Sequence, residues 1–172
     1  AYACYALKCT LAPQIPNNHA SLSPFKVSAP VNCILNAVHP APVAVRHVLG
    51  QFLPDVVLGA LHKMLPDTVP AEGSSALWNV QLGAYPIEGA EPAEGEVLRS
   101  SQILMFNSGG TGARPTLDGL SATAFPSGVH TMSTEVTEHV GPITIWRKEL
   151  REGSGGAGRQ RGGLGQVIEI SA

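Results

Sequence analysis

The glycine-rich segment at residues 107–118 has the residue types and spacing that best suit ligand chemistry. It begins Asn-Ser-Gly-Gly-Thr-Gly-Ala-Arg-Pro, follows a predicted strand and leads to Asp118. Glycine lets main-chain amides approach a ligand closely, Arg114 can pair with an anionic group, and Asp118 can accept from an N–H group or bind a metal. Long loops of this kind are often functional. The alternative is a structural crossover in which Arg114 and Asp118 pair with each other.

A second glycine-rich segment, residues 153–158, matches G-x-G-x-x-G and comes close to a Walker A loop. Both nucleotide motifs need a helix directly after the glycines, because its N-terminus meets the phosphate. Here Arg-Gln-Arg-Gly-Gly follows, and then a predicted strand. The sequence therefore favours a connection between strands. Several basic residues gather at positions 147–161, which indicates a solvated face or a subunit contact, with an anion site as the alternative.

Four polar residues form one stripe along the predicted long helix: His47, Gln51, Asp55 and His62. Their spacing contains no H-x-x-x-H or H-E-x-x-H pair, so we do not expect this helix alone to bind a metal. Glu135 lies four residues before His139, and the two are neighbours only if the threonine-rich stretch around them is helical. No serine lies in a G-x-S-x-G elbow and no cysteine in a recognisable nucleophile motif.

The predicted elements place helices early and strands late in the chain. Residues 1–11 are apolar nearly all round, which is typical of a buried helix. From Pro42, at the first helical position, apolar residues recur at helical spacing as far as Met64. Pro54 lies inside this run and predicts either a kinked helix or two abutting helices.

Strands are predicted at residues 25–29, 32–35, 76–84, 99–107, 143–150 and 165–170. The last two are expected to form a hairpin or a neighbouring pair. The predicted fold class is α+β: a long kinked helix plus a shorter helix packed with a mixed, largely antiparallel sheet.

Composition limits the function classes. Hydrophobic residues make up 44% of the 172 residues, enough for a packed core. Charged residues reach only 14%, so we expect much of the surface to be covered by other protein. A net charge of −2 argues against a nucleic-acid binder, and the longest apolar run, residues 56–61, is too short to span a membrane. Three cysteines without motif spacing predict reduced thiols in a cytoplasmic protein.

Long sequence runs resemble the hydantoinase B / 5-oxoprolinase family over essentially all 172 residues. They are YALKC (5–9) with IPNN (15–18), ILN (34–36), PAPVAVRHVLGQFLPDVVLGAL (40–61), VPAEGSSALWN (69–79), GGTGARPTLDGLSATAFPSGV (109–129) and WRKELREGSGGAGRQRGGLGQVIEI (146–170). Family members are longer, so the resemblance implies that residues 1–172 are a single internal-to-C-terminal piece of a larger subunit. It also implies that a divalent metal is bound by a segment upstream of these residues, and that residues 1–172 contribute no metal ligand.

The function implied by the resemblance is part of the B-type subunit of an ATP-dependent cyclic amide hydrolase. A hydantoinase A-like partner would use ATP and Mg²⁺ to phosphorylate the amide oxygen of a hydantoin or oxoproline ring, and the B-type subunit would support attack by water. Phosphorylation turns a poor electrophile into an activated one. The expected assembly is a hetero-oligomer in which this piece alone is inactive. The alternatives are the matching subunit of an ATP-dependent ketone carboxylase, of the acetone type, and a non-catalytic scaffold domain.

The glycine-rich loop is the best candidate for contact with a small cyclic amide. We expect the amides of Gly109, Gly110 and Gly112 to hold an oxyanion and Arg114 to neutralise charge. His47 and Glu135 are weaker candidates, and no catalytic residue is assigned. The substrate-binding candidates are Asn107, Gly109, Gly110, Gly112, Arg114, Asp118, His47 and Glu135.

Overall fold

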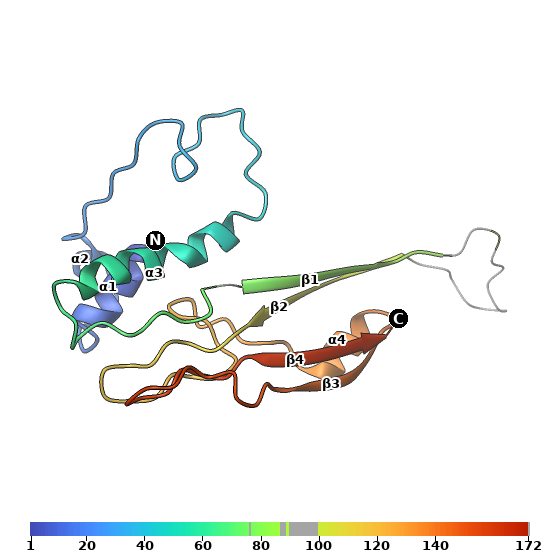
Figure 1. Ribbon diagram of the computed structural model, residues 1–172. Helices are drawn as coiled ribbons and strands as arrows, with labels where there is room; N and C mark the ends of the chain where they lie inside the picture. Colours follow the sequence, from blue (N-terminus) through green and yellow to red (C-terminus); the bar gives the residue numbers. More distant parts are fainter. Residues whose placement is uncertain (76, 87–88, 90–99, 172) are drawn as a thin grey trace.

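The computed structural model describes residues 1–75, 77–86, 89 and 100–171. It confirms the predicted α+β class, with the first three helices gathered at one end, two β-ribbons beside them and the fourth helix next to the ribbons (Figure 1). The elements are α1 (Tyr2–Leu11), α2 (His19–Leu22), α3 (Arg46–His62), β1 (Leu77–Ala84), β2 (Ser101–Ser108), α4 (Thr134–Val140), β3 (Thr144–Leu150) and β4 (Gln166–Ser171).

The helical part consists of α1 packed on α3. Its core joins Ala6 of α1 and Leu58 of α3 to Val69, which follows α3. The helix predicted over residues 1–11 is confirmed, although most of its side chains are only partly buried. Residues that are far from one another in the chain thus share one hydrophobic core.

The long helix is one continuous element that contains Pro54, not two abutting helices. Its start was predicted wrongly at Pro42. Val45 has a φ of 57°, in the left-handed region, and a right-handed helix cannot run back through such a residue. The helix therefore begins at Arg46. The predicted kink at Pro54 stays a prediction.

The strands form two separate antiparallel ribbons instead of one mixed sheet. In the first, β1 pairs with β2 from Leu77↔Ser108 to Ala84↔Ser101. In the second, β3 pairs with β4, which confirms the expected neighbours, and the register shifts between Ile145 and Arg147. All four late strands begin and end within two residues of their predicted bounds.

A second core lies between the two ribbons. Its buried members are Ile103 and Met105 of β2 and Ile143, just before β3. Helix α4, which the threonine-rich sequence left undecided, lies against β2 and β3. Glu138 of α4 fixes this position because its Oε1 accepts a hydrogen bond from the Ile145 N–H at 2.7 Å.

The strands predicted at residues 25–29 and 32–35 are not formed. This part of the chain contains one isolated bridge, Cys33 to Asn36, within a long excursion above α3 (Figure 1). Prolines bound each short run and cannot donate to a strand ladder, and no described strand lies alongside. Apolar side chains there stay exposed, among them Val31 (78%) and Ile34 (74%).

The three cysteines are free and half-buried. No helix in the described part of the chain has the length and hydropathy needed to cross a membrane.

Candidate functional site

The two glycine-rich loops, here residues 109–122 and 151–165, lie against each other and are joined through the main chain. The N–H of Gly163 donates to the Thr111 carbonyl at 2.9 Å, and the N–H of Ala122 donates to the Leu164 carbonyl at 2.9 Å. On the other side, the N–H of Ser74 donates to the Gly110 carbonyl at 2.9 Å. Three segments that are distant in sequence therefore meet at Gly110–Thr111.

This crossing explains much of the glycine content. A Cβ on Gly110 would lie 2.0 Å from the Gly163 carbonyl oxygen, and one on Gly112 would lie 1.7 Å from that of Ala71. A carbon and an oxygen cannot approach so closely, so only glycine lets these chains pass. The second loop has the structural role predicted for it, and β4 rather than a helix follows it.

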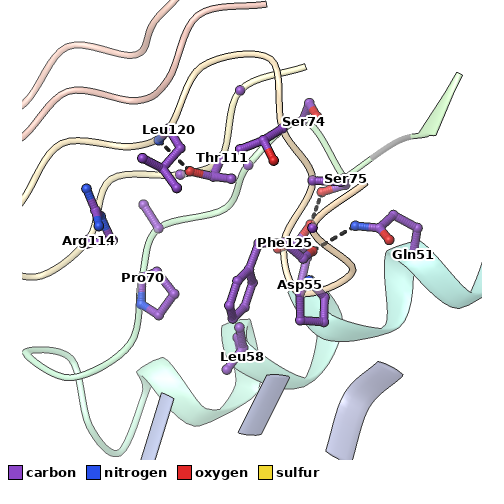
Figure 2. A pocket seen from close by; sticks show the side chains of 18 of the residues that line it. Gln51, Asp55, Leu58, Pro70, Ser74, Ser75, Thr111, Arg114, Leu120 and Phe125 are labelled. Atoms are coloured by element: carbon purple, nitrogen blue, oxygen red, sulfur yellow. Dashed lines mark hydrogen bonds between the residues drawn. The ribbon is translucent and has the colours of Figure 1, made fainter. Parts of the chain in front are cut away.

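A cleft of about 340 Å³ lies between α3 and this crossing. Figure 2 shows Asp55, Gln51 and Ser75 together on one side and Arg114 and Pro70 on the other. Apolar side chains, including Leu58 and Phe125, lie between the two polar sides. The volume falls in the range of sites for small molecules, which combine apolar walls with a few placed polar groups.

The acidic side of the cleft is Asp55, held by a neighbour from another segment. The Ser75 hydroxyl donates a hydrogen bond to Asp55 Oδ2. Burial raises the pKa of the Asp55 carboxyl, the hydrogen bond from Ser75 opposes this, and the charge of Glu72 raises the pKa further. Ser75 has a φ of 53°, a conformation that costs energy for a residue with a side chain. Strain and a partly buried carboxylate therefore coincide at the cleft wall.

Gln51 fastens the segment that contains Phe125 to α3. Its Nε2 donates to the Phe125 carbonyl at 2.7 Å, and its Oε1 accepts from the Ser127 hydroxyl at 3.2 Å. Both ends of this buried amide are thus satisfied. The contact holds in place the segment of Phe125, which lines the cleft together with Leu58.

Arg114 and Asp118 are joined, but not as a carboxylate pair. Arg114 Nε and Nη2 donate to the main-chain carbonyl of Asp118 at 2.9 and 2.6 Å. The Asp118 carboxylate instead accepts the N–H of Arg161 at 2.7 Å, which ties the first loop to the second. Asp118 therefore fastens the loop here, while Arg114 remains an exposed cation that lines the cleft.

The structure brings only three of the eight predicted binding residues to this cleft: Gly110, Gly112 and Arg114. Gly109 lines a second hollow of about 610 Å³, which the second glycine-rich loop also lines. The two hollows share a common wall formed by Ala71, Gly73, Ser74, Gly110 and Thr111.

The remaining candidates lie elsewhere. Asn107 is completely buried between the ribbons beside Lys148, and neither polar atom of its side-chain amide has a partner among the described residues. His47, at the start of α3, contacts the Asn79 side chain through Nε2 at 2.8 Å and packs edge-on against Phe106, with ring centroids 5.5 Å apart.

Glu135 lies on α4, the helix that packs against β2 and β3. Its charge acts on the ammonium of Lys148, whose pKa burial lowers. Because α4 is helical, Glu135 and His139 are one turn apart, an arrangement that the sequence left undecided. Neither residue lines the cleft.

Within the described ranges, no group of three or more His, Cys, Asp or Glu side chains could hold a metal ion. Two cleft residues, Asp55 and Ser75, were missing from the predicted set. The polar stripe on α3 was a usable signal for Asp55, because Gln51 and Asp55 both line the cleft. Nothing in the sequence near Ser75 signalled that it would meet a residue twenty positions earlier.

Fold and site together define an α+β domain that contains a small cleft walled by crossed glycine-rich main chain. Comparison with known proteins identifies the family. The chain matches the hydantoinase B/oxoprolinase family over residues 1–172 and belongs to that family.

Three relatives show the spread of the family. An uncharacterized protein of Methanocaldococcus jannaschii is 35% identical over 94% of this chain and 26% of its own length. The 5-oxoprolinase PfmaA of Pestalotiopsis fici is 28% identical over 98% of this chain and 12% of its own. The caprolactamase subunit beta of Pseudomonas jessenii is 31% identical over 82% of this chain and 24% of its own. The chain thus spans about a quarter or less of these relatives.

Proposed function

We propose that this chain is part of the B-type subunit of an ATP-dependent hydrolase that opens a cyclic amide ring. The observation that carries the proposal is the cleft of about 340 Å³, with a carboxylate on one side and a guanidinium on the other. Family membership supports the reaction class, since the names of relatives refer to oxoproline and caprolactam rings.

The residues of the cleft suit such a ring. Leu58 and Phe125 offer apolar contact to ring carbons, and Asp55 can accept a hydrogen bond from the ring N–H. Arg114 has donors beyond the two that hold the Asp118 carbonyl, and these suit the oxygen on which negative charge develops. The predicted oxyanion role of the Gly110 and Gly112 amides belongs to the same proposal.

ATP and Mg²⁺ are proposed to act on a hydantoinase A-like partner, which would activate the amide by phosphorylating its oxygen. A divalent metal is proposed on a segment upstream of residues 1–172, as the resemblance to the family implies. We assign no step of this chain to that metal.

A hetero-oligomeric assembly is the second part of the proposal. Many large apolar side chains are exposed, especially on the excursion and on the outer face of α3, where Val56 is 68% exposed. Charged residues make up only 14% of the chain. Exposed apolar surface on this scale is typical of an interface, and one relative is named as a subunit of caprolactamase. We propose that other protein of the complete enzyme covers this surface.

The test is turnover by the complete enzyme, which contains this chain, its flanking polypeptide and the partner subunit. Hydantoin, 5-oxoproline and caprolactam are supplied with ATP and Mg²⁺, and ring opening and phosphate release are followed together. Coupled release of both products supports the proposal. Consumption of acetone that requires bicarbonate would instead favour the ketone carboxylase. Absence of both activities in an assembled complex would favour the scaffold role.

A further inference from the structure

Asp55 is the carboxylate of the cleft. Among the described residues that line it, the other ionisable side chains are Arg114 and His130. Arg114 stays protonated throughout the range in which proteins are stable, so it cannot relay a proton. Asp55, by contrast, is half-buried and held by a hydrogen bond, whereas none is found for the His130 ring among the described residues. A proton-transfer group in this cleft is therefore best sought at Asp55.

The position of Asp55 is determined by two segments. Helix α3 presents it one turn after Gln51, whose amide fixes the cleft wall through the Phe125 carbonyl. The opposite contact comes from Ser75, whose neighbour Ser74 is bound through its N–H to the Gly110 carbonyl at 2.9 Å. Through Ser75 and Ser74, the Asp55 carboxylate is thus linked to the same glycine crossing that lines the rest of the cleft.

Ser75 does not adopt an ordinary conformation to make this contact. Its φ of 53° is sparsely populated for residues with a side chain, and such strain persists only where the surroundings enforce it. A glycine at this position would relieve the strain but lose the hydroxyl. The hydrogen bond to Asp55 gives a physical reason for a serine there.

We propose that Asp55 is the proton acceptor and donor of the cleft and that Ser75 is the residue that positions its carboxylate. This inference rests on the proposed ring-opening function. Water adds its oxygen to the ring carbonyl carbon while one of its protons passes to Asp55. The bond between carbon and nitrogen then breaks, and the same proton passes to the ring nitrogen, which leaves as an amine, while the carbon keeps the phosphorylated oxygen as an acyl phosphate. A second water then hydrolyses this acyl phosphate to the free acid and inorganic phosphate. The carboxylate of Asp55 is regenerated by the proton transfer to the ring nitrogen, and no further reactant is consumed at Asp55.

The electrostatic surroundings agree with this role. Burial and the nearby charge of Glu72 raise the pKa of Asp55, and a carboxylate with a raised pKa is a stronger base. Ser75 acts in the opposite direction, because its hydrogen bond stabilises the ionised form. The charged or titratable groups that face Asp55 are Glu72, Arg114 across the cleft and His130 in its lining.

The test uses the complete enzyme with ATP, Mg²⁺ and 5-oxoproline, hydantoin or caprolactam as the probe. Asp55→Asn keeps the size of the side chain and an acceptor for Ser75, and should lower kcat by about 10²- to 10⁴-fold with KM little changed. Asp67→Asn is the matched control, because Asp67 is exposed beyond α3, and should leave kcat unchanged. The unfolding temperature of each variant shows whether the fold is retained.

Ser75→Ala distinguishes positioning from a purely structural role. Loss of the hydroxyl removes a hydrogen bond that lowers the pKa of Asp55, so the acid limb of the pH profile of kcat/KM should move to higher pH. An unchanged kcat in a folded Asp55→Asn enzyme would overturn the proposed role of Asp55 but not the proposed ring-opening function. The same holds if His130→Gln, and not Asp55→Asn, removes the acid limb of the pH profile. A native enzyme that opens none of the three rings would overturn the proposed function as well.

Discussion

Replacement of Gly112 by alanine tests whether the glycines serve the chain crossing. The new Cβ would lie 1.7 Å from the Ala71 carbonyl oxygen, and the two must separate by more than 1 Å to reach even the 3.0 Å limit of real contacts. Such a movement breaks or weakens the hydrogen bond from the Ala71 N–H to the Ala113 carbonyl, now 2.8 Å long. Overpacking costs about 1–3 kcal/mol and a lost hydrogen bond about 0.5–1.5 kcal/mol. We therefore expect a loss of about 2–4 kcal/mol in the free energy of unfolding.

The assay is urea unfolding followed by circular dichroism, with Gly59→Ala as the matched control. Gly59 lies inside α3, and a Cβ there would meet nothing within 4 Å. Alanine should stabilise that site by about 0.5–1 kcal/mol, because glycine is a poor helix former. If Gly112→Ala is as stable as the native protein, the crossing does not require glycine, and a ligand-contact role for this amide becomes the better explanation.

Three further predictions concern charged and buried polar groups. Arg114→Ala should lower kcat/KM of the complete enzyme by about tenfold or more through loss of a charged hydrogen bond, with assembly mass unchanged; unaltered turnover would refute this. Because the native state holds a proton on Asp55 more tightly than the unfolded state, ionisation of Asp55 destabilises the fold as pH rises through its raised pKa. Asp55→Asn should therefore unfold at a higher temperature than the native protein at neutral pH, and the difference should vanish below the ordinary Asp pKa of 3.8; a difference that persists there would contradict the linkage. Asn107→Leu should raise the free energy of unfolding by about 1–3 kcal/mol, because it removes an amide that is buried without partners among the described residues. The control Thr137→Val should lower the free energy of unfolding, because it removes a hydroxyl that is bonded to the Ser133 carbonyl at 2.8 Å. A destabilised Asn107→Leu protein would show that the amide has a partner.

Local patterns were sufficient wherever one element decides its own structure. The apolar spacing along residues 46–62 and the four late strands carry periodicities that neighbours in sequence create, and these were predicted closely. The failures at residues 25–29 and 32–35 have a common cause. A short apolar run becomes a strand only when another strand pairs with it, and the presence of a partner is not a local property.

The candidate site shows the same division. The sequence marked the glycine-rich loop, and Gly110, Gly112 and Arg114 do line the cleft. It could not separate glycines that face a ligand from glycines that let two chains pass, because that depends on the 2.0 Å between the Gly110 Cβ position and Gly163. It grouped Asn107 and Glu135 with the loop, although the tertiary structure places them around Lys148, away from the cleft.

The sequence by itself determined the α+β class, the helical face that bears Gln51 and Asp55, and the family, because each of these depends on residue order and periodicity. Only the tertiary structure decided which side chains share a cavity. Asp55 and Ser75 are twenty residues apart and meet because Ser74 is anchored to Gly110, which is itself held against Gly163. Contacts of this kind arise from packing between distant segments, and no local pattern of residues encodes them.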